Sequence, residues 1–198
     1  MLHASGRAPK EIMTPRDIMK SAARIRSSIH EVLQVDFVEW DQVDSYIDDL
    51  NQVLDEIDSL GEAAPAAALE LAWRFIKRIP AVFNNVHDEC ELAMFCSDLA
   101  QAAWTLAKKA GNPIDDSAAR LLDAYAADAH DTCRFDDVLD ILAKARLSRE
   151  QRRLLAAAAL RAARAHPKAA SELRAFANKC SQPAPGRASR SGRGRKVA

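Results

Sequence analysis

The sequence predicts an all-α protein made of stacked antiparallel helical hairpins, an α-solenoid-like arrangement of about eight helices. Alanine and leucine are abundant while aromatic residues make up only 6% of the 198 residues, and this composition favours helix. Six glycines and eight prolines are too few for the many tight turns of an all-β protein. Apolar residues recur every three or four positions in one segment after another, and the short connections between segments favour antiparallel neighbours.

The first two helices have clear boundary signals. Thr14 can cap the first helix, Pro15 suits its first position, and Asp17 lies near the positive end of its dipole. The second helix is expected over residues 41–60, with one apolar face and aspartates on the others. Gly61 follows directly and is expected to be its C-terminal stop.

The third and fourth helices are bounded by prolines and glycine. Pro65 opens the third helix and Pro80 ends it. The fourth is long, over residues 84–110, and two lysines lie at its negative end. The Gly-Asn-Pro sequence at 111–113 then breaks the chain.

Capping residues also predict the helices that follow. Asp116 or Ser117 is expected to cap the fifth helix, and a sixth is expected over residues 135–145. Ser148 and Gln151 have the spacing of a capping box, which predicts the start of a seventh helix.

The last helix is short, over residues 168–179, and the composition of the chain changes after it. The final segment is rich in Pro, Gly, Ser and Arg, and it has too few apolar residues to offset the entropy of ordering. The expected organisation is a flexible N-terminus at 1–13, one helical domain at 14–180, and a disordered basic tail at 181–198.

The net charge of zero conceals an acidic first half. Between Ser27 and Trp73 there are twelve Asp and Glu and no Lys or Arg. A helix with such a face can receive a basic partner segment, and the alternative is an ordinary solvated face. The residues expected to bind a partner on this acidic face are Asp44, Asp48, Asp49, Asp55 and Asp58.

The C-terminal part of the chain is basic. From Lys144 to Ala198 there are fifteen Lys and Arg and only two Glu. This balance predicts, as an alternative function, non-specific and salt-dependent binding of nucleic-acid phosphates, although no aromatic residue in the tail offers a stacking platform. Other interpretations are a solubilising extension or a tail that folds back on the acidic helix. The residues of the nucleic-acid alternative are Arg149, Arg152, Arg153, Arg187, Arg190, Arg193, Arg195 and Lys196.

Two similar short motifs, "HDEC" at 87–90 and "HDTC" at 130–133, raise the question of a metal site. Residues three apart share a helix face, so His87, Cys90, His130 and Cys133 could together bind a tetrahedral zinc ion. Cys90, however, falls on the apolar side of its helix, where a free cysteine packs as a small hydrophobe. The two motifs are 43 residues apart, and this spacing is similar to the length of a two-helix repeat. We therefore expect no cofactor, and zinc remains the alternative.

A second metal hypothesis comes from the all-helical HD-type phosphohydrolases. His30, His87, Asp88 and Asp131 have the order of that family's ligands, but the surrounding "NNVHDECEL" does not resemble it. The chain has no phosphate-binding loop, GxSxG elbow or HExxH motif. These observations favour a protein that is not an enzyme.

One long stretch resembles a known family. It contains "VDSYIDDLNQVLDEI" and, after a short turn, "AAALELAWRFIKRI", with "FDDVLDILAKARLS" as its last piece. This stretch, residues 35–147, resembles an uncharacterised bacterial helical domain sometimes found downstream of SWIM-type zinc fingers. The resemblance implies a tetratricopeptide-like or HEAT-like stack with no established activity. "NNVHDEC" replaces the acidic turn of that family, and the chain has no SWIM-type CxC…CxH motif of its own.

The sequence thus predicts a non-enzymatic protein-interaction or scaffold module of helical-repeat type. Its partner would be a protein, a second copy of the chain, or nucleic acid through the basic third. Four sparse cysteines and the absence of an apolar secretory segment in residues 1–10 favour the cytoplasm. No stretch is apolar enough for a membrane span, so no membrane is expected.

Overall fold

The computed structural model describes residues 13–78, 89–127 and 134–182, and these residues form eight α-helices. Two single 3₁₀ turns, Trp40–Gln42 and Pro167–Ala169, precede the second and the last helix. The helices are α1 (Pro15–Val32), α2 (Val43–Ala63), α3 (Pro65–Arg78), α4 (Glu89–Lys109), α5 (Ile114–Ala126), α6 (Arg134–Lys144), α7 (Arg149–Ala165) and α8 (Ala170–Ser181). The predicted all-α class is confirmed.

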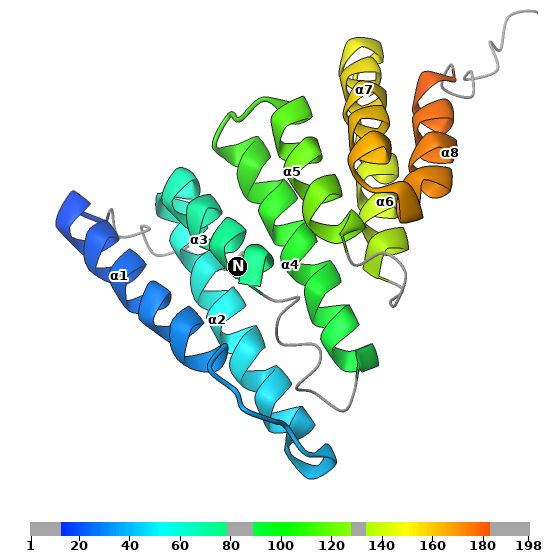
Figure 1. Ribbon diagram of the computed structural model, residues 1–198. Coiled ribbons are helices and arrows are strands. Elements are labelled where there is room, and N and C mark those ends of the chain that lie inside the picture. Colours follow the sequence, from blue (N-terminus) through cyan, green and yellow to red (C-terminus); the bar gives the residue numbers. More distant parts are fainter. Residues whose placement is uncertain (1–12, 79–88, 128–133, 183–198) are drawn as a thin grey trace, which may run out of the picture.

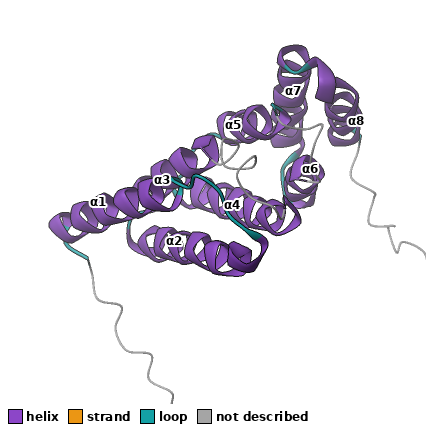
Figure 2. Ribbon diagram, turned by 60° about the horizontal axis from the view of Figure 1, so that its bottom comes forward, coloured by secondary structure: helices purple, strands orange, loops and turns teal. Residues whose placement is uncertain are grey.

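The helices form two layers (Figures 1 and 2). We call α1, α3, α5 and α7 the odd layer and α2, α4, α6 and α8 the even layer. Within the even layer α2 packs on α4, α4 on α6 and α6 on α8; in the odd layer α1 packs on α3 and α5 on α7. Contact between α3 and α5 is slight, so the odd layer is interrupted at its centre. One cluster of buried side chains runs between the layers from Ile25 to Cys180.

Two predicted helix starts are confirmed in detail. The Asp17 backbone N–H donates to Thr14 Oγ1 at 3.2 Å, and the Gln151 N–H donates to Ser148 Oγ at 3.1 Å. In both cases the third helical side chain also accepts from the backbone N–H of the cap, which completes a capping box. These bonds join residues three apart, so they depend only on local sequence.

The predicted cap of α5 is wrong. The helix begins at Ile114 after Pro113, and Asp116 lies in its first turn, not at its cap. Ser117 is buried and donates from Oγ to the Pro113 carbonyl at 3.1 Å. Pro113 starts the helix because its fixed φ suits the approach to a helix, while the aspartates act on the helix dipole.

Two glycines have different roles from each other. Gly61 is not a C-terminal stop, because α2 continues to Ala63 and Gly61 is buried in its last turn. A Cβ at Gly61 would overlap Leu106 of α4, so glycine permits the close approach of α2 and α4. Gly111, in contrast, has φ 72° and ends α4 as predicted, with the Asn112 N–H donating to the Ala107 carbonyl at 3.0 Å.

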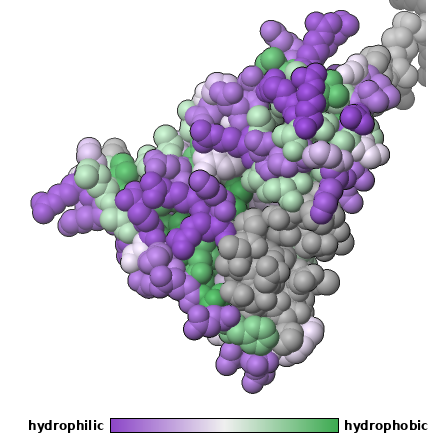
Figure 3. Space-filling model, in the orientation of Figure 1, coloured by the Kyte–Doolittle hydropathy of each residue, from purple (hydrophilic) through white to green (hydrophobic). Residues whose placement is uncertain are grey.

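The surface of the described helices is mostly hydrophilic in the view of Figure 3, with apolar side chains visible between the polar groups over α3 and those over α5. Trp104 is buried in the core, whereas Trp40 is 64% exposed. None of the described helices is long and apolar enough to cross a membrane.

Candidate interaction surfaces

The predicted acidic face on α2 is present, in part, as a stripe. Asp44, Asp48, Asp55 and Asp58 are all exposed, and spacings of four, seven and three residues place them along one side of the helix. Asp49 lies on the side nearer α1, seven residues before Glu56, which pairs with Arg24 of α1 at 2.7 Å. The structure therefore brings four of the five residues together and separates the fifth. We call these four residues the α2 stripe.

The end of the α2 stripe is electrostatically crowded. Asp58 is exposed as a whole residue, but partial burial of its carboxyl raises the pKa of that group. Lys109 of α4 opposes the shift, and Asp55 and Glu62 add to it. Lys109 pairs with Glu62 at 2.8 Å. One lysine thus faces several carboxylates, and α2 itself contains no Lys or Arg. An added cation would relieve this repulsion.

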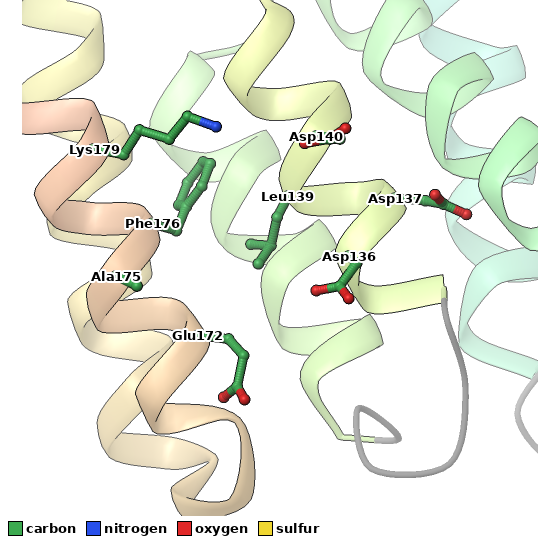
Figure 4. A pocket seen from close by; sticks show the side chains of 8 residues that line it. All are labelled: Asp136, Asp137, Leu139, Asp140, Glu172, Ala175, Phe176 and Lys179. Carbon is green, nitrogen blue, oxygen red and sulfur yellow. The ribbon is translucent and has the colours of Figure 1, made fainter.

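A second acidic surface, which the sequence reasoning missed, is the cleft between α6 and α8 (Figure 4). It has a volume of about 420 Å³, with Leu139 and Phe176 among its apolar lining residues. Figure 4 shows Asp136 and Glu172 toward one end of the cleft and Asp140 and Lys179 toward the other. The remaining lining residues are Asp137 and Ala175. The only sequence signal was the group of aspartates at the start of α6, and the approach of α8 could not be inferred from it.

Two carboxylates of this cleft already have partners. Asp137 is turned toward α4, where it accepts a hydrogen bond from Ser97 Oγ at 2.6 Å. Asp140 pairs with Lys144 one turn later at 3.2 Å. Among the described residues, Asp136 and Glu172 have no such pair. The end of the cleft with Asp136 and Glu172 is therefore the more negative one.

The basic residues predicted on α7 are only partly clustered. Arg149 and Arg153 are exposed, as are Arg161 and Arg164 in the second half of the helix. Arg152 is half-buried on the side of α8. Burial raises the pKa of the Cys180 thiol of α8, and the positive charge of Arg152 opposes this shift. The tail residues Arg187, Arg190, Arg193, Arg195 and Lys196 lie outside the described residues.

Neither metal hypothesis can be followed through the described part of the chain. His87, His130 and Cys133, like Asp88 and Asp131, lie outside the described residues, as does the side chain of Cys90. His30 is exposed on α1, with Gln34 Nε2 at 2.9 Å from its Nε2 and Arg78 donating to its Nδ1 at 3.3 Å. Within residues 13–78, 89–127 and 134–182 no group of three or more His, Cys, Asp or Glu is arranged to hold a metal ion.

Comparison with known proteins gives one match. Residues 9–197 match a family described as a "Family of unknown function (DUF6880)". No curated protein and no solved structure matches the chain.

Proposed function

Starting from the fact that the chain belongs to this family of unknown function, we propose that it is a non-enzymatic interaction module whose even layer binds basic segments of a protein partner. A two-layer stack of helices exposes long rows of side chains on each layer, which suits the recognition of extended or helical segments. The tetratricopeptide-like or HEAT-like repeat type, the link with SWIM-type fingers and the cytoplasmic location stay predictions.

The observation that carries the proposal is the α2 stripe. Four exposed aspartates follow one side of a helix that has no basic residue, and the α6–α8 cleft adds Asp136 and Glu172 to the same layer. Asp98 is exposed on α4, between α2 and α6. Lys and Arg side chains of a partner could therefore meet carboxylates across the width of the layer.

The small free energies of exposed ion pairs favour electrostatic steering of the partner over high affinity. An exposed ion pair contributes about 0.2–1 kcal/mol, so the stripe alone supports a moderate, salt-sensitive complex. Complementary charge mainly raises the association rate and sets the orientation of the partner.

The direct test is fluorescence anisotropy with a labelled peptide of alternating Arg and Ser. The variant Asp44→Asn/Asp48→Asn/Asp55→Asn removes three charges from the stripe, and Asp36→Asn/Asp116→Asn/Glu150→Gln removes three exposed charges elsewhere. Three pairs at about 0.5 kcal/mol each predict a roughly tenfold higher Kd for the stripe variant and little change for the control. Equal affinity of the two variants would contradict the proposal.

A second candidate function is nucleic-acid binding, favoured by the four exposed arginines of α7. Each phosphate contact releases counterions, so binding of duplex DNA or RNA should weaken steeply with salt. Anisotropy with the full chain and with residues 1–182, each with and without Arg149→Ala/Arg153→Ala, separates the helix from the tail. Salt-independent binding, or none at low salt, removes this candidate.

A further inference from the structure

The odd layer contains two grooves that adjoin each other. The α1–α3 groove has a volume of about 720 Å³ and lies between Arg26 and His30 of α1 and Arg74 and Arg78 of α3. The α3–α5 groove has a volume of about 760 Å³ and lies where the odd layer is interrupted, between Trp73 and Ile76 of α3 and Ala124 of α5. Lys77 lines both grooves, so they meet at this side chain.

The α1–α3 groove carries positive charge that the described residues do not neutralise. Its lining includes Arg26, Arg74, Lys77 and Arg78 and no carboxylate. Of these, Arg74 pairs with Glu70 at 3.0 Å, and Arg78 donates to Nδ1 of His30. Arg26 and Lys77 form no ion pair with any described residue. Like charges that converge on one groove repel each other, and a bound anion would relieve this repulsion.

The α3–α5 groove is mainly apolar, and apart from Lys77 its charged groups already have partners. Arg120 lies over the ring of Trp73, with its guanidinium carbon 5.7 Å from the ring centroid, and Asp123 pairs with His166 at 3.0 Å. Ile76 and Ala124 extend the apolar lining. Figure 3 shows apolar side chains at this position, between the polar groups over α3 and α5. The Trp73 Nε1 is buried and has no hydrogen-bond partner.

We propose that these two grooves together bind an acidic protein segment with one apolar anchor, the carboxylates lying in the α1–α3 groove and the anchor in the α3–α5 groove. Charge complementarity determines the first half of the site, and a mainly apolar groove with room for the anchor determines the second. The proposal does not depend on the even-layer function.

The same features favour a peptide over a nucleic acid. Base stacking needs an open aromatic face, but Arg120 already lies over the Trp73 ring. A phosphate backbone that continued past Lys77 would reach Asp123 in the α3–α5 groove, where negative charge disfavours it. An acidic peptide needs cations on one side of its anchor only, which is the arrangement that the grooves offer.

The test uses the full chain and a fluorescein-labelled peptide of four Glu, one Gly and a Leu-Phe pair. The variants are Lys77→Glu, where the grooves meet, and Arg26→Ala/Arg78→Ala; the matched control is Lys20→Glu, an exposed lysine of α1 outside both grooves. We expect the Kd to rise about tenfold or more for both groove variants and less than about threefold for the control. Replacing Leu-Phe by Gly-Gly should weaken binding to the unmodified chain by about tenfold or more.

NMR spectroscopy shows where the apolar anchor of the peptide binds. In ¹H–¹⁵N spectra the indole signal of Trp73, assigned through Trp73→Phe, should shift on addition of the peptide, while the signal of buried Trp104 should not. The proposal is overturned if the peptide does not bind at low salt, if Lys77→Glu binds as well as Lys20→Glu, or if the anchor makes no difference. It is also overturned if single-stranded DNA binds more tightly through the same cations, or if the grooves instead mediate self-association that Lys77→Glu abolishes.

Discussion

Replacing Gly61 by alanine should destabilise the protein, although the same change stabilises most helix interiors. Gly61 lies in the last turn of α2, where alanine would gain about 1 kcal/mol in helix propensity. The new Cβ, however, would overlap Leu106 Cδ2, and Leu106 is only 1% exposed and cannot move into solvent. Ala68 Cβ, at 3.6 Å from the new atom, is an ordinary contact.

The expected magnitude follows from these two opposing effects. Overpacking a dense core costs about 1–3 kcal/mol, and the overlap of the new Cβ with the buried Leu106 side chain favours the upper part of that range, about 2–3 kcal/mol. After subtraction of the gain of about 1 kcal/mol in helix propensity, the net loss should be about 1–2 kcal/mol. For a domain of this size that corresponds to a melting temperature lower by roughly 2–8 °C. Urea unfolding at 25 °C measures the free energy, and a thermal melt checks it.

A double-mutant cycle assigns the loss to the contact. Leu106→Ala alone should cost about 2–5 kcal/mol, and Gly61→Ala in that background should be neutral or stabilising, because the new methyl group then occupies vacated space. Gly111→Ala provides a contrast, since its Cβ would meet nothing within 4 Å and its cost would come from φ 72° alone. If Gly61→Ala is as stable as the unmodified protein, the close approach of α2 and α4 does not restrain this residue.

Three further predictions concern single side chains. Tyr125→Phe should lower the free energy of unfolding by about 1 kcal/mol, because the buried hydroxyl donates to the Cys96 carbonyl at 2.7 Å; an unchanged urea midpoint would contradict this. Ser148→Ala should cost about 1 kcal/mol through loss of the α7 cap, and Ser148→Asp should restore most of it, so equal losses for both would refute the role of the cap. Burial raises the pKa of Asp58 above its ordinary value of 3.8, so ionising the carboxyl costs more free energy in the folded than in the unfolded state. The contribution of Asp58 to stability therefore falls as the pH rises from its unfolded-state pKa through its folded-state pKa. Asp58→Asn should therefore gain stability relative to the unmodified protein between about pH 3 and pH 7, and a constant or shrinking difference in urea midpoints would show that Lys109 outweighs burial.

The features that the sequence predicted well depend on short spacings. Thr14 and Asp17, and Ser148 and Gln151, are three residues apart, and their hydrogen bonds form within one turn of helix. The α2 stripe likewise follows from helical periodicity. Local geometry is nearly the same in every helix, so such patterns can be interpreted without a tertiary structure.

The features that could not be predicted depend on contacts between distant parts of the chain. The role of Gly61 is determined by Leu106, and the acidic cleft requires Glu172 to approach Asp136. The α3–α5 groove exists because α3 and α5 separate, which no residue in either helix signals. Composition indicates that α7 is basic, but it does not reveal that Arg152 is turned toward α8.

The order of helix contacts has a consequence for folding. Every extensive contact joins helices that are adjacent or next but one along the chain, so no helix depends directly on the opposite end. Contacts of such short sequence separation favour rapid folding, and cooperativity should decay with distance along the stack. Opening should therefore begin at α1 or α8 and progress inward one helix at a time, giving amide exchange that slows from both ends toward α4 and α5. A surface on one half of the stack could then loosen or tighten on binding while the other half keeps its structure.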